Sequence, residues 1–341
     1  IPVIGNGDIK TAEDALRIYA TGAYEAVGHA VSGPPGASRV VFTPVPKSWG
    51  PTFLAFDYGL ETSLGGNPML LASALLRRTW PEAGGREWRG LLQLGRETRV
   101  ETDLRENFGS SRRLFLLSRV GWYDQREDVF ADGSRVAAFD ERAVYGELRA
   151  GVELGTSGEV QLGLFRRNTD LRLDIGLPPV AGLSRYDDGG YLVEYERDTR
   201  DSDLWATRGS RQRLEFQAAE TALGAEARWR TALVEFNESM VLNRALLFMD
   251  LAGGTSFGTR TPFHQLFRLG GPGALSGLEY GALRGAEFAY LQAGAGWRLA
   301  DVDPLLGMTL YAGGALEAGN VWESIDDSAP DGLRLGARLF V

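Results

Sequence analysis

The sequence predicts a mainly β fold, a transmembrane antiparallel β-barrel preceded by a small α+β unit, and three observations support it. From Thr52 onward, apolar and polar residues alternate with period two, in segments of roughly ten residues or more, the length that a tilted strand needs to span the hydrocarbon core. No run of about 18 apolar residues occurs, which excludes a transmembrane helix. The 45 glycines, 16 phenylalanines, 11 tyrosines and 8 tryptophans are typical of barrels with tight turns and interfacial aromatic girdles.

The first 50 residues have a different pattern from the rest of the chain. Apolar residues recur at helical spacing over Thr11–Thr21, which predicts a short helix. Two extended runs follow, Tyr24–Val31 and Arg39–Val45, and the SGPPGAS segment between them is typical of a turn. The proline-rich stretch ending in Lys47–Pro51 marks a boundary, so we expect one unit over residues 1–50 and a barrel over residues 51–341.

The alternation is clearest in three segments near the C-terminus, Ala289–Leu299, Leu306–Gly319 and Leu333–Val341. About fourteen strands of this kind are expected between Thr52 and Val341. A soluble β-sandwich also alternates, but its strands usually run about five or six residues, so the length favours a membrane barrel. Turns are predicted at Gly65–Asn67, Gly84–Gly85, Asp132–Gly133, Thr156–Gly158 and Asp187–Gly190.

The same alternation assigns side chains to the two faces of the sheet. The alternating leucines and alanines, with Trp122, Trp229 and Trp297, are expected to face lipid. The opposite face carries arginines and glutamates, which we interpret as a salt-bridged, hydrated lumen; an electrostatic path for an unfolded polypeptide is the sharper alternative. These lumen residues are Arg113, Arg119, Arg149, Arg211, Arg213, Arg298, Arg334 and Arg338, with Glu147, Glu153, Glu215 and Glu317.

The net charge disfavours a nucleic-acid-binding protein, and the residues offer no site for a soluble enzyme. The net charge of −9 disfavours a nucleic-acid partner, and the absence of cysteine excludes disulfides and thiolate metal sites. The two histidines, His29 and His264, lack a second histidine at ligand spacing, so both are interpreted as surface or loop residues and no metal site is predicted. Asp188–Gly189 is interpreted as part of a turn. We therefore predict no catalytic, cofactor-binding or metal-binding residue.

Several segments resemble one group of bacterial membrane proteins. Phe53–Gly95 resembles the barrel entry of patatin-like phospholipase autotransporters, type V secretion proteins in the surface-antigen superfamily of outer-membrane assembly and two-partner secretion transporters. Tyr195–Gly209 is similar to the superfamily's strand-turn signature, an Asp-rich turn that ends in Arg-Gly. The matching residues are Asp198, Asp201, Asp203, Arg208 and Gly209.

Phe267–Gly285 is similar to the sixth extracellular loop of these proteins, which folds back into the lumen. The family's Gly-Gly pair and Leu-Ser-Gly tip are matched by Gly270, Gly271, Leu275, Ser276 and Gly277. In the superfamily an arginine at the tip points into the lumen; Ser276 stands near that place, and Arg284 is the candidate substitute. A β-branched residue in place of Gly271 or Gly277 is expected to disturb the path of the loop.

The resemblance extends to the N-terminal unit. Leu16–Val27 is similar to the end of a POTRA module, a periplasmic unit that precedes such barrels, and it looks truncated. Ile1–Ile9 alone is similar to a dihydrouridine synthase loop near a flavin phosphate, but nine residues without the rest of that fold do not make a site. The family's barrel has sixteen strands and an aromatic C-terminal residue, so we expect the last two strands to be missing.

The resemblance implies an outer-membrane translocator or assembly domain of a Gram-negative bacterium, with the POTRA-like unit in the periplasm. It would insert or export a passenger, a patatin-like lipase attached upstream. The implied partners are outer-membrane lipids, a passenger or client polypeptide, and the outer-membrane assembly machinery; no cofactor is implied. The alternatives are a passive anchor for a surface lipase, a diffusion porin and, most distantly, a fragment of a soluble flavin-dependent tRNA-modifying enzyme.

Overall fold

The computed structural model describes residues 3–5, 24–32, 39–46, 52–61, 69–80, 86–109, 112–131, 133–176, 185–201, 206–303, 308–324 and 332–340. These residues are almost all in β-strands, with two short 3-10 helices in connections. None of the described helices has the length and hydropathy needed to cross a bilayer.

The described elements follow one another along the chain from the small N-terminal strands to the large sheet. They are β1 (Val3–Gly5), β2 (Tyr24–Ser32), β3 (Arg39–Pro46), β4 (Thr52–Glu61), β5 (Met69–Trp80), β6 (Arg86–Leu94), β7 (Glu97–Phe108), β8 (Leu114–Ala131), β9 (Ser134–Leu154), β10 (Gly158–Gly176), β11 (Arg185–Asp198), β12 (Gly209–Ala219), η2 (Thr221–Leu223), β13 (Trp229–Leu242), β14 (Ala245–Thr255), η3 (Phe263–Gln265), β15 (Phe267–Leu269), β16 (Leu283–Asp303), β17 (Met308–Ser324) and β18 (Arg334–Phe340).

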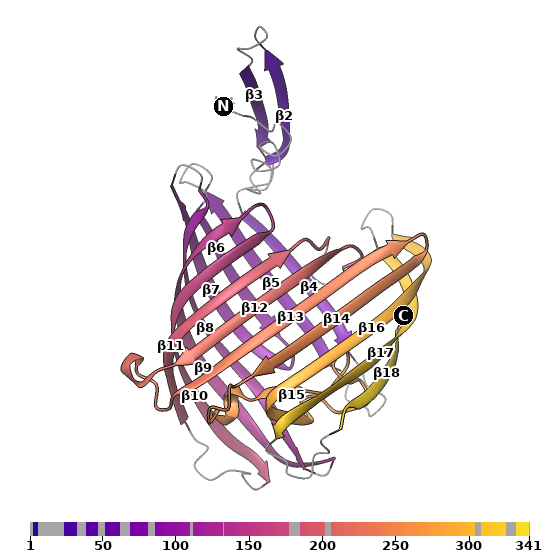
Figure 1. Cartoon of the computed structure of the whole chain (residues 1–341). Helices are drawn as coiled ribbons and strands as arrows, with labels where there is room; N and C mark the ends of the chain where they lie inside the picture. The colour runs from indigo at the N-terminus through magenta and orange to yellow at the C-terminus, as the bar shows by residue number, and fades with distance from the viewer. Residues whose placement is uncertain are drawn as a thin grey trace.

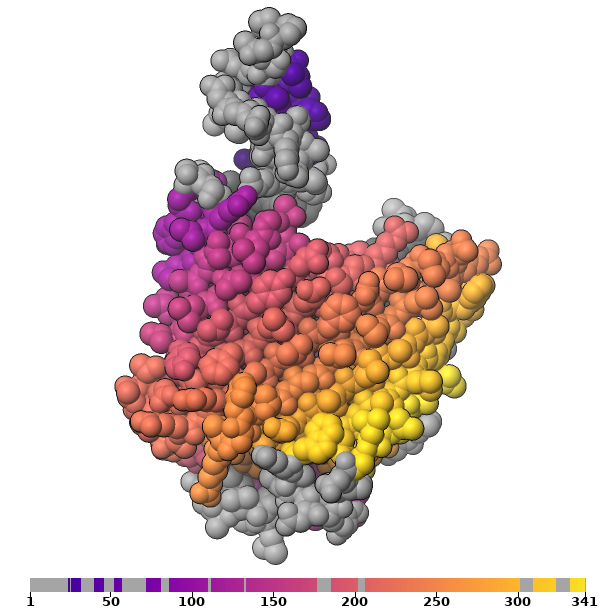
Figure 2. All heavy atoms as spheres, viewed as in Figure 1, coloured from indigo at the N-terminus to yellow at the C-terminus, as the bar shows by residue number. Residues whose placement is uncertain are grey.

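The large sheet is antiparallel and curls into a barrel (Figure 1). It has fifteen strands: β4 to β14, β16, β17 and β18 pair in chain order, and β15 adds to β16 off this path. The predicted barrel of about fourteen long strands is therefore confirmed. In the space-filling view, the strands form a continuous oblique wall (Figure 2). Among the described strands, β4 and β18 end the path, and each pairs with one neighbour.

Burial follows the predicted alternation along the strands. On β16, Leu291 and Trp297 are 42% and 55% exposed on the outer face, whereas Gln292 is 1% exposed on the inner face. On β17, Leu316 is 73% exposed and the adjacent Glu317 is buried. A water-soluble protein rarely exposes so much contiguous apolar surface, so this outer face is the lipid-facing side of a membrane barrel.

Two predictions about the start of β11 and β13 are wrong. Trp229 does not face lipid: its side chain is buried, and its indole Nε1 donates to Asp188 Oδ1 at 2.8 Å. Asp188–Gly189 is not a turn, because both residues lie inside β11. Glycine at 189 and 190 serves close approach instead: a Cβ at either position would lie within 3.0 Å of the backbone oxygen of Leu223 or Ala218.

The barrel has two unlike ends. The end that carries the connections 155–157 and 243–244 is called the turn end, and the opposite end, which carries residues 256–282, the loop end. Apolar side chains gather inside the loop end, where Phe263 packs with Val129, Phe139 and Leu171 from β8, β9 and β10. The loop end is therefore filled from within by side chains of the long connection.

The small sheet has the strand order β1-β3-β2 and lies beyond the turn end of the barrel (Figure 1). The predicted runs Tyr24–Val31 and Arg39–Val45 form its hairpin as β2 and β3. Val3–Gly5 pairs with β3 as β1. The predicted helix Thr11–Thr21 lies outside the described residues.

Candidate functional site

The candidate site is the connection of residues 256–282 between β14 and β16, which we call the lumen loop. It contains η3 and β15, and β15 pairs with the start of β16. Its polar side chains contact β8 on one wall of the barrel and β17 on the other. Because seven strands separate β8 from β17 in the strand order, the loop crosses the lumen.

On the first wall, two arginines contact a single carboxylate. Arg268 in β15 and Arg284 at the start of β16 both bond to Glu127 on the inner face of β8. Arg284 and Glu127 are each 5% exposed, and the Arg284 guanidinium also lies 4.2 Å from the ring centroid of Phe263. Removing one member of such a buried charge cluster is strongly destabilising, so Glu127 fixes the base of the loop.

A second buried contact holds η3. His264 Nε2 lies 2.6 Å from Asp188 Oδ2, and both side chains are at most 3% exposed. The ring of Tyr186 lies over the imidazole at 4.4 Å between centroids. Burial lowers the pKa of His264 despite the neighbouring carboxylate. The neutral imidazole therefore donates from Nε2 to Asp188. Of the two predicted alternatives, a surface or a loop histidine, the structure shows a loop histidine whose side chain is buried.

The tip of the loop binds the opposite wall. Ser276 donates from its backbone nitrogen to Glu317 Oε2 at 2.6 Å and from its hydroxyl to Oε1 at 2.8 Å. The Tyr290 hydroxyl reaches the same carboxylate at 3.4 Å and donates to Gly273 O at 2.7 Å. Ser276 thus occupies the position next to a buried lumen carboxylate, whereas Arg284 lies with Glu127 at the other wall.

Glycines shape the path to this tip. Gly270 and Gly271 have φ values of 125° and 105°, which disfavour any residue with a side chain. Leu275 also has a positive φ of 76°, and its side chain is buried with Leu269 and Tyr290. At Gly277 a Cβ would meet nothing within 4 Å, so the strain expected there on substitution is absent.

The residues of the strand-turn signature meet at the turn end. Asp198 pairs with Arg200, whose Nη2 lies 2.7 Å from Oδ2. Asp201 accepts from Thr207 N at 2.8 Å and from Arg208 N at 3.2 Å, which closes the turn. Gly209 has a φ of 98° beside the backbone of Thr199. Asp203 lies outside the described residues. This signature is separate from the lumen loop and shapes the β11–β12 connection.

Ion pairs line the inner wall between β6 and β13. Arg149 lies 2.7 Å from Glu147 and 3.4 Å from Glu194, and Arg213 reaches Glu194 at 3.1 Å. Of the arginines assigned to the lumen, five form ion pairs with described carboxylates: Arg119, Arg149, Arg211, Arg213 and Arg338. This pattern supports the interpretation of a lumen that neutralises its own charge.

One hydrolase-type sequence motif was not identified among the predicted features. Gly254–Gly258 reads GTSFG and matches the Gly-x-Ser-x-Gly pattern of hydrolase nucleophile elbows. Ser256 is 0% exposed, and its hydroxyl has no hydrogen-bond partner among the described residues. A nucleophile needs a bonded base and access to substrate, so this serine does not have the geometry of one. Within the described residues, no group of three or more His, Asp or Glu side chains could hold a metal ion.

The family comparison assigns the barrel. The model of the Omp85 superfamily domain matches residues 107–319, which is more than half of the chain. The chain belongs to the Omp85 superfamily. The matched region of this Omp85 chain runs from the end of β7 through the lumen loop to β17. No curated protein sequence matches the chain.

Solved structures have the same fold. BamA from Haemophilus ducreyi lacking POTRA domains 1–3 matches with a TM-score of 0.62 at 14% identity over 92% of this chain and 65% of that one. CdiB from Acinetobacter baumannii matches with a TM-score of 0.63 at 11% identity, over 99% and 66%. CdiB from Escherichia coli matches with a TM-score of 0.56 at 16% identity, over 94% and 68%. The chain spans just under two thirds of the first two structures.

The partners of the loop were not predicted, although one of them left a signal. The alternation that places Arg119 and Tyr123 on the inner face of β8 also places Glu127 there, four residues further on. A buried inward carboxylate requires a cation, which the loop supplies. Asp188 gave no such signal, because the two glycines after it suggested a turn.

Proposed function

We propose that the chain is the membrane-embedded part of an outer-membrane translocator or assembly protein of a Gram-negative bacterium, which inserts or exports a client polypeptide. Membership of the Omp85 superfamily and the fold shared with BamA and CdiB support this proposal. Its further partners are outer-membrane lipids and the outer-membrane assembly machinery. No catalytic step is needed, because strand pairing and movement of the lumen loop would carry the process.

One observation carries the proposal: buried polar contacts hold the lumen loop to both walls of the barrel, at Glu127 and at Glu317. A diffusion porin needs an open aqueous channel, whereas a barrel filled by a loop suits gated passage of a particular client. The loop therefore favours the translocator over the porin.

The N-terminal sheet supports a periplasmic receptor role. Among the described strands of this sheet, β2 lies at the edge and pairs on one side, with β3. An exposed edge of this kind can bind an extended client by strand addition. We propose that this POTRA-like unit lies in the periplasm, and that residues 1–50 and residues 51–341 form the two domains.

The passenger is proposed from the sequence alone. Phe53–Gly95, which includes β4, β5 and β6, resembles the barrel entry of patatin-like phospholipase autotransporters. We propose a patatin-like lipase as the exported domain; a passive anchor for that lipase is the alternative, and it differs in requiring no movement of the loop.

The test reconstitutes the protein into lipid vesicles and adds one of two unfolded clients, an eight-stranded outer-membrane barrel or a patatin-type lipase domain. Protection of a client from external protease, together with low ion conductance of the protein alone, is the expected result. Protection of the first client indicates assembly, and protection of the second indicates export. A steady open conductance with neither client protected would show a porin, and low conductance with no protection would show a passive anchor.

A further inference from the structure

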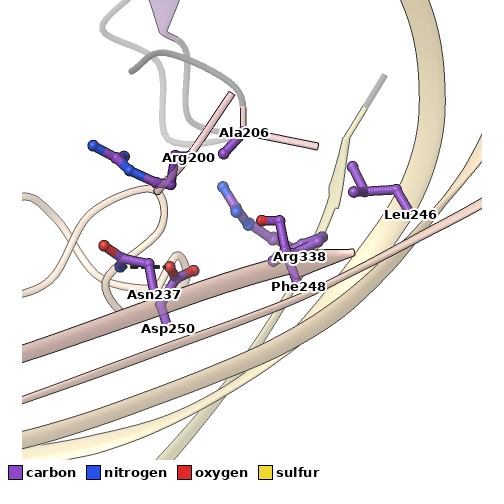
Figure 3. Close-up of a pocket in the computed structure, with 8 residues that line it drawn as sticks. Arg200, Ala206, Asn237, Leu246, Phe248, Asp250 and Arg338 are labelled. Carbon is purple, nitrogen blue, oxygen red and sulfur yellow. Dashed lines mark hydrogen bonds between the residues drawn. The ribbon is translucent and has the colours of Figure 1, made fainter. Parts of the chain in front are cut away.

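A pocket opens inside the barrel (Figure 3). Nε of its lining residue Arg338 lies 4.0 Å from Oε1 of Glu317, the carboxylate that binds the tip of the lumen loop. The volume of the pocket is about 220 Å³, room for roughly seven water molecules at about 30 Å³ each. Residues from the β11–β12 turn, β13, β14 and β18 line it, and they include Arg200, Asn237, Leu246, Phe248, Asp250 and Arg338. It is large enough for one side chain of an extended polypeptide.

The aromatic floor of the pocket is Phe248, with Phe340 packed against it, and glycines in β16 and β17 make room for the two rings. A Cβ at Gly294 would lie within 3.0 Å of the ring of Phe248, and a Cβ at Gly313 would lie 2.8 Å from Cζ of Phe340. The two rings pack on each other with their centroids 5.7 Å apart. Because each ring packs directly against a glycine of the sheet, the strand positions determine where the two rings lie.

Most polar groups around the pocket already have partners. Asp250 accepts from Asn237 Nδ2 at 2.8 Å and from Gln292 Nε2 at 3.2 Å, and Arg200 pairs with Asp198. These contacts hold the wall rigid, and two amides already occupy the carboxylate of Asp250. Arg338 is therefore the lining residue that we expect to bind an added anion.

Arg338 has weaker partners than Arg149 and Arg213, which lie 2.7 Å from Glu147 and 3.1 Å from Glu194. Its Nε is buried without a hydrogen-bond partner among the described residues, and the nearest described carboxylate oxygen, Glu317 Oε1, is 4.0 Å away. Glu317 already accepts from Ser276 N and Oγ. The guanidinium lies 6.0 Å from the centroid of Phe248 and 5.8 Å from that of Phe340. A carboxylate ligand would complete its charge-assisted bonding.

We propose that this pocket binds a carboxylate of an extended client polypeptide, which Arg338 holds over the aromatic floor. The inference rests on the proposed function, since it names the chemistry that such a client would present inside the barrel. The carboxylate can belong to an aspartate or glutamate side chain or to the C-terminus. An aromatic floor beside a guanidinium fits a peptide better than a simple inorganic anion.

The test measures binding of short fluorescent peptides to the detergent-solubilised protein by anisotropy. One peptide has an internal glutamate and an amidated end, a second has glutamine and a free C-terminal carboxylate, and a third has glutamine and an amidated end. We expect at least one carboxylate peptide to bind on the order of tenfold more tightly than the neutral one, and the first two peptides identify which carboxylate is bound. Equal binding of all three would overturn the proposal without any variant.

Variants then locate the site. Arg338→Gln should abolish the preference, Arg338→Lys should keep part of it, and the matched control Arg334→Gln in the same strand should leave it intact. Loss of the preference in the control alone would overturn the assignment to Arg338. Heat-modifiable migration in gels confirms folding, and if Arg338→Gln does not fold, the lysine variant and the peptide series decide.

The two proposals can fail separately. A carboxylate preference that depends on Arg338, in a protein that protects no client in vesicles, would retain the pocket and reject the translocator. Client protection without any carboxylate preference would retain the translocator and reject the carboxylate-binding pocket.

Discussion

His264 Nε2 and Asp188 Oδ2 lie 2.6 Å apart although 76 positions separate the two residues in the chain. Trp229 donates to the other oxygen of Asp188, and Arg167 Nε lies 4.0 Å from the oxygen that His264 contacts. The carboxylate of β11 therefore joins η3 of the lumen loop to the barrel wall. His264 Nδ1 has no hydrogen-bond partner among the described residues. Protonation of Nδ1 would therefore create a buried N–H donor without an acceptor, which destabilises the folded protein.

Acid should weaken this contact. The pKa of His264 in the folded protein is below its ordinary value because the ring is buried, so the unfolded chain takes up the proton first as pH falls. The contribution of His264 to stability is fully present above about pH 6.5 and is lost as the pH falls toward the folded-state pKa. We expect the midpoint temperature of thermal unfolding to be lower at about pH 5 than at about pH 8.

His264→Gln should remove that part of the pH dependence, measured by thermal unfolding in detergent. His29→Gln, the matched control at an exposed histidine of β2, should retain the wild-type profile. A flat wild-type profile, or an equal change in both variants, would show that His264 is not the responsible group.

Adding a methyl group at Gly190 should be costly. A Cβ there would lie within 3.0 Å of the Ala218 carbonyl oxygen, a backbone atom that cannot move aside without breaking the β11–β12 ladder. We expect Gly190→Ala to lower the free energy of unfolding by about 1–3 kcal/mol or more. Gly277→Ala is the control, because nothing lies within 4 Å of a Cβ at that position, and its urea midpoint should match that of the wild type.

The loop tip should become more accessible when Glu317 is removed. Glu317→Ala takes away the acceptor for Ser276 N and Oγ, and each such bond contributes on the order of 1 kcal/mol or more. The chain has no cysteine, so a Gly277→Cys variant carries a single reporter at the tip.

Maleimide labelling of that reporter should be faster in Glu317→Ala, by roughly fivefold or more. Glu215→Ala, which removes a lumen carboxylate paired with Arg213 instead, should leave the labelling rate unchanged. Equal rates in Glu317→Ala and in its parent would mean that the carboxylate does not hold the tip.

Spin labels can test which face of β16 contacts lipid. A label at Leu291 should be accessible to oxygen and shielded from a polar nickel reagent, whereas a label at Gln292 should show less preference for oxygen. Leu291 is 42% exposed and Gln292 is 1% exposed. Similar accessibility ratios at both positions would contradict the assignment of the outer face to lipid.

The barrel could be predicted from the sequence because strand alternation is a local property. Leu291 and Gln292 point to opposite faces whatever the rest of the chain does, and the glycine-rich breaks set the count of strands. The contacts of the candidate site could not be predicted in the same way. The role of Asp188 depends on its contacts with Trp229 of β13 and His264 of η3, which are distant in sequence. Gly189 is needed because a Cβ there would clash with the backbone of Leu223, and not because it forms a turn.

The family resemblance located the loop but not its chemistry. It identified Gly270, Gly271 and Ser276 as a lumen loop and left the tip without its expected arginine. The structure places Ser276 on Glu317 and Arg284 on Glu127, so two different walls hold the two positions that the sequence treated as alternatives. Which wall a loop residue reaches depends on the curvature of the whole sheet, and no local pattern encodes that.

Glu317 has neighbours on both of its sides. Its oxygens accept from Ser276 of the lumen loop, and a Cβ at Gly336 in β18 would lie 3.0 Å from Oε2. Gly336 is the register partner of Glu317, so the last described strand leaves room beside the carboxylate that binds the loop tip. A side chain at position 336 would compete with Ser276 for the space around Glu317, so the lack of a single β-carbon in β18 helps to keep the loop tip in place.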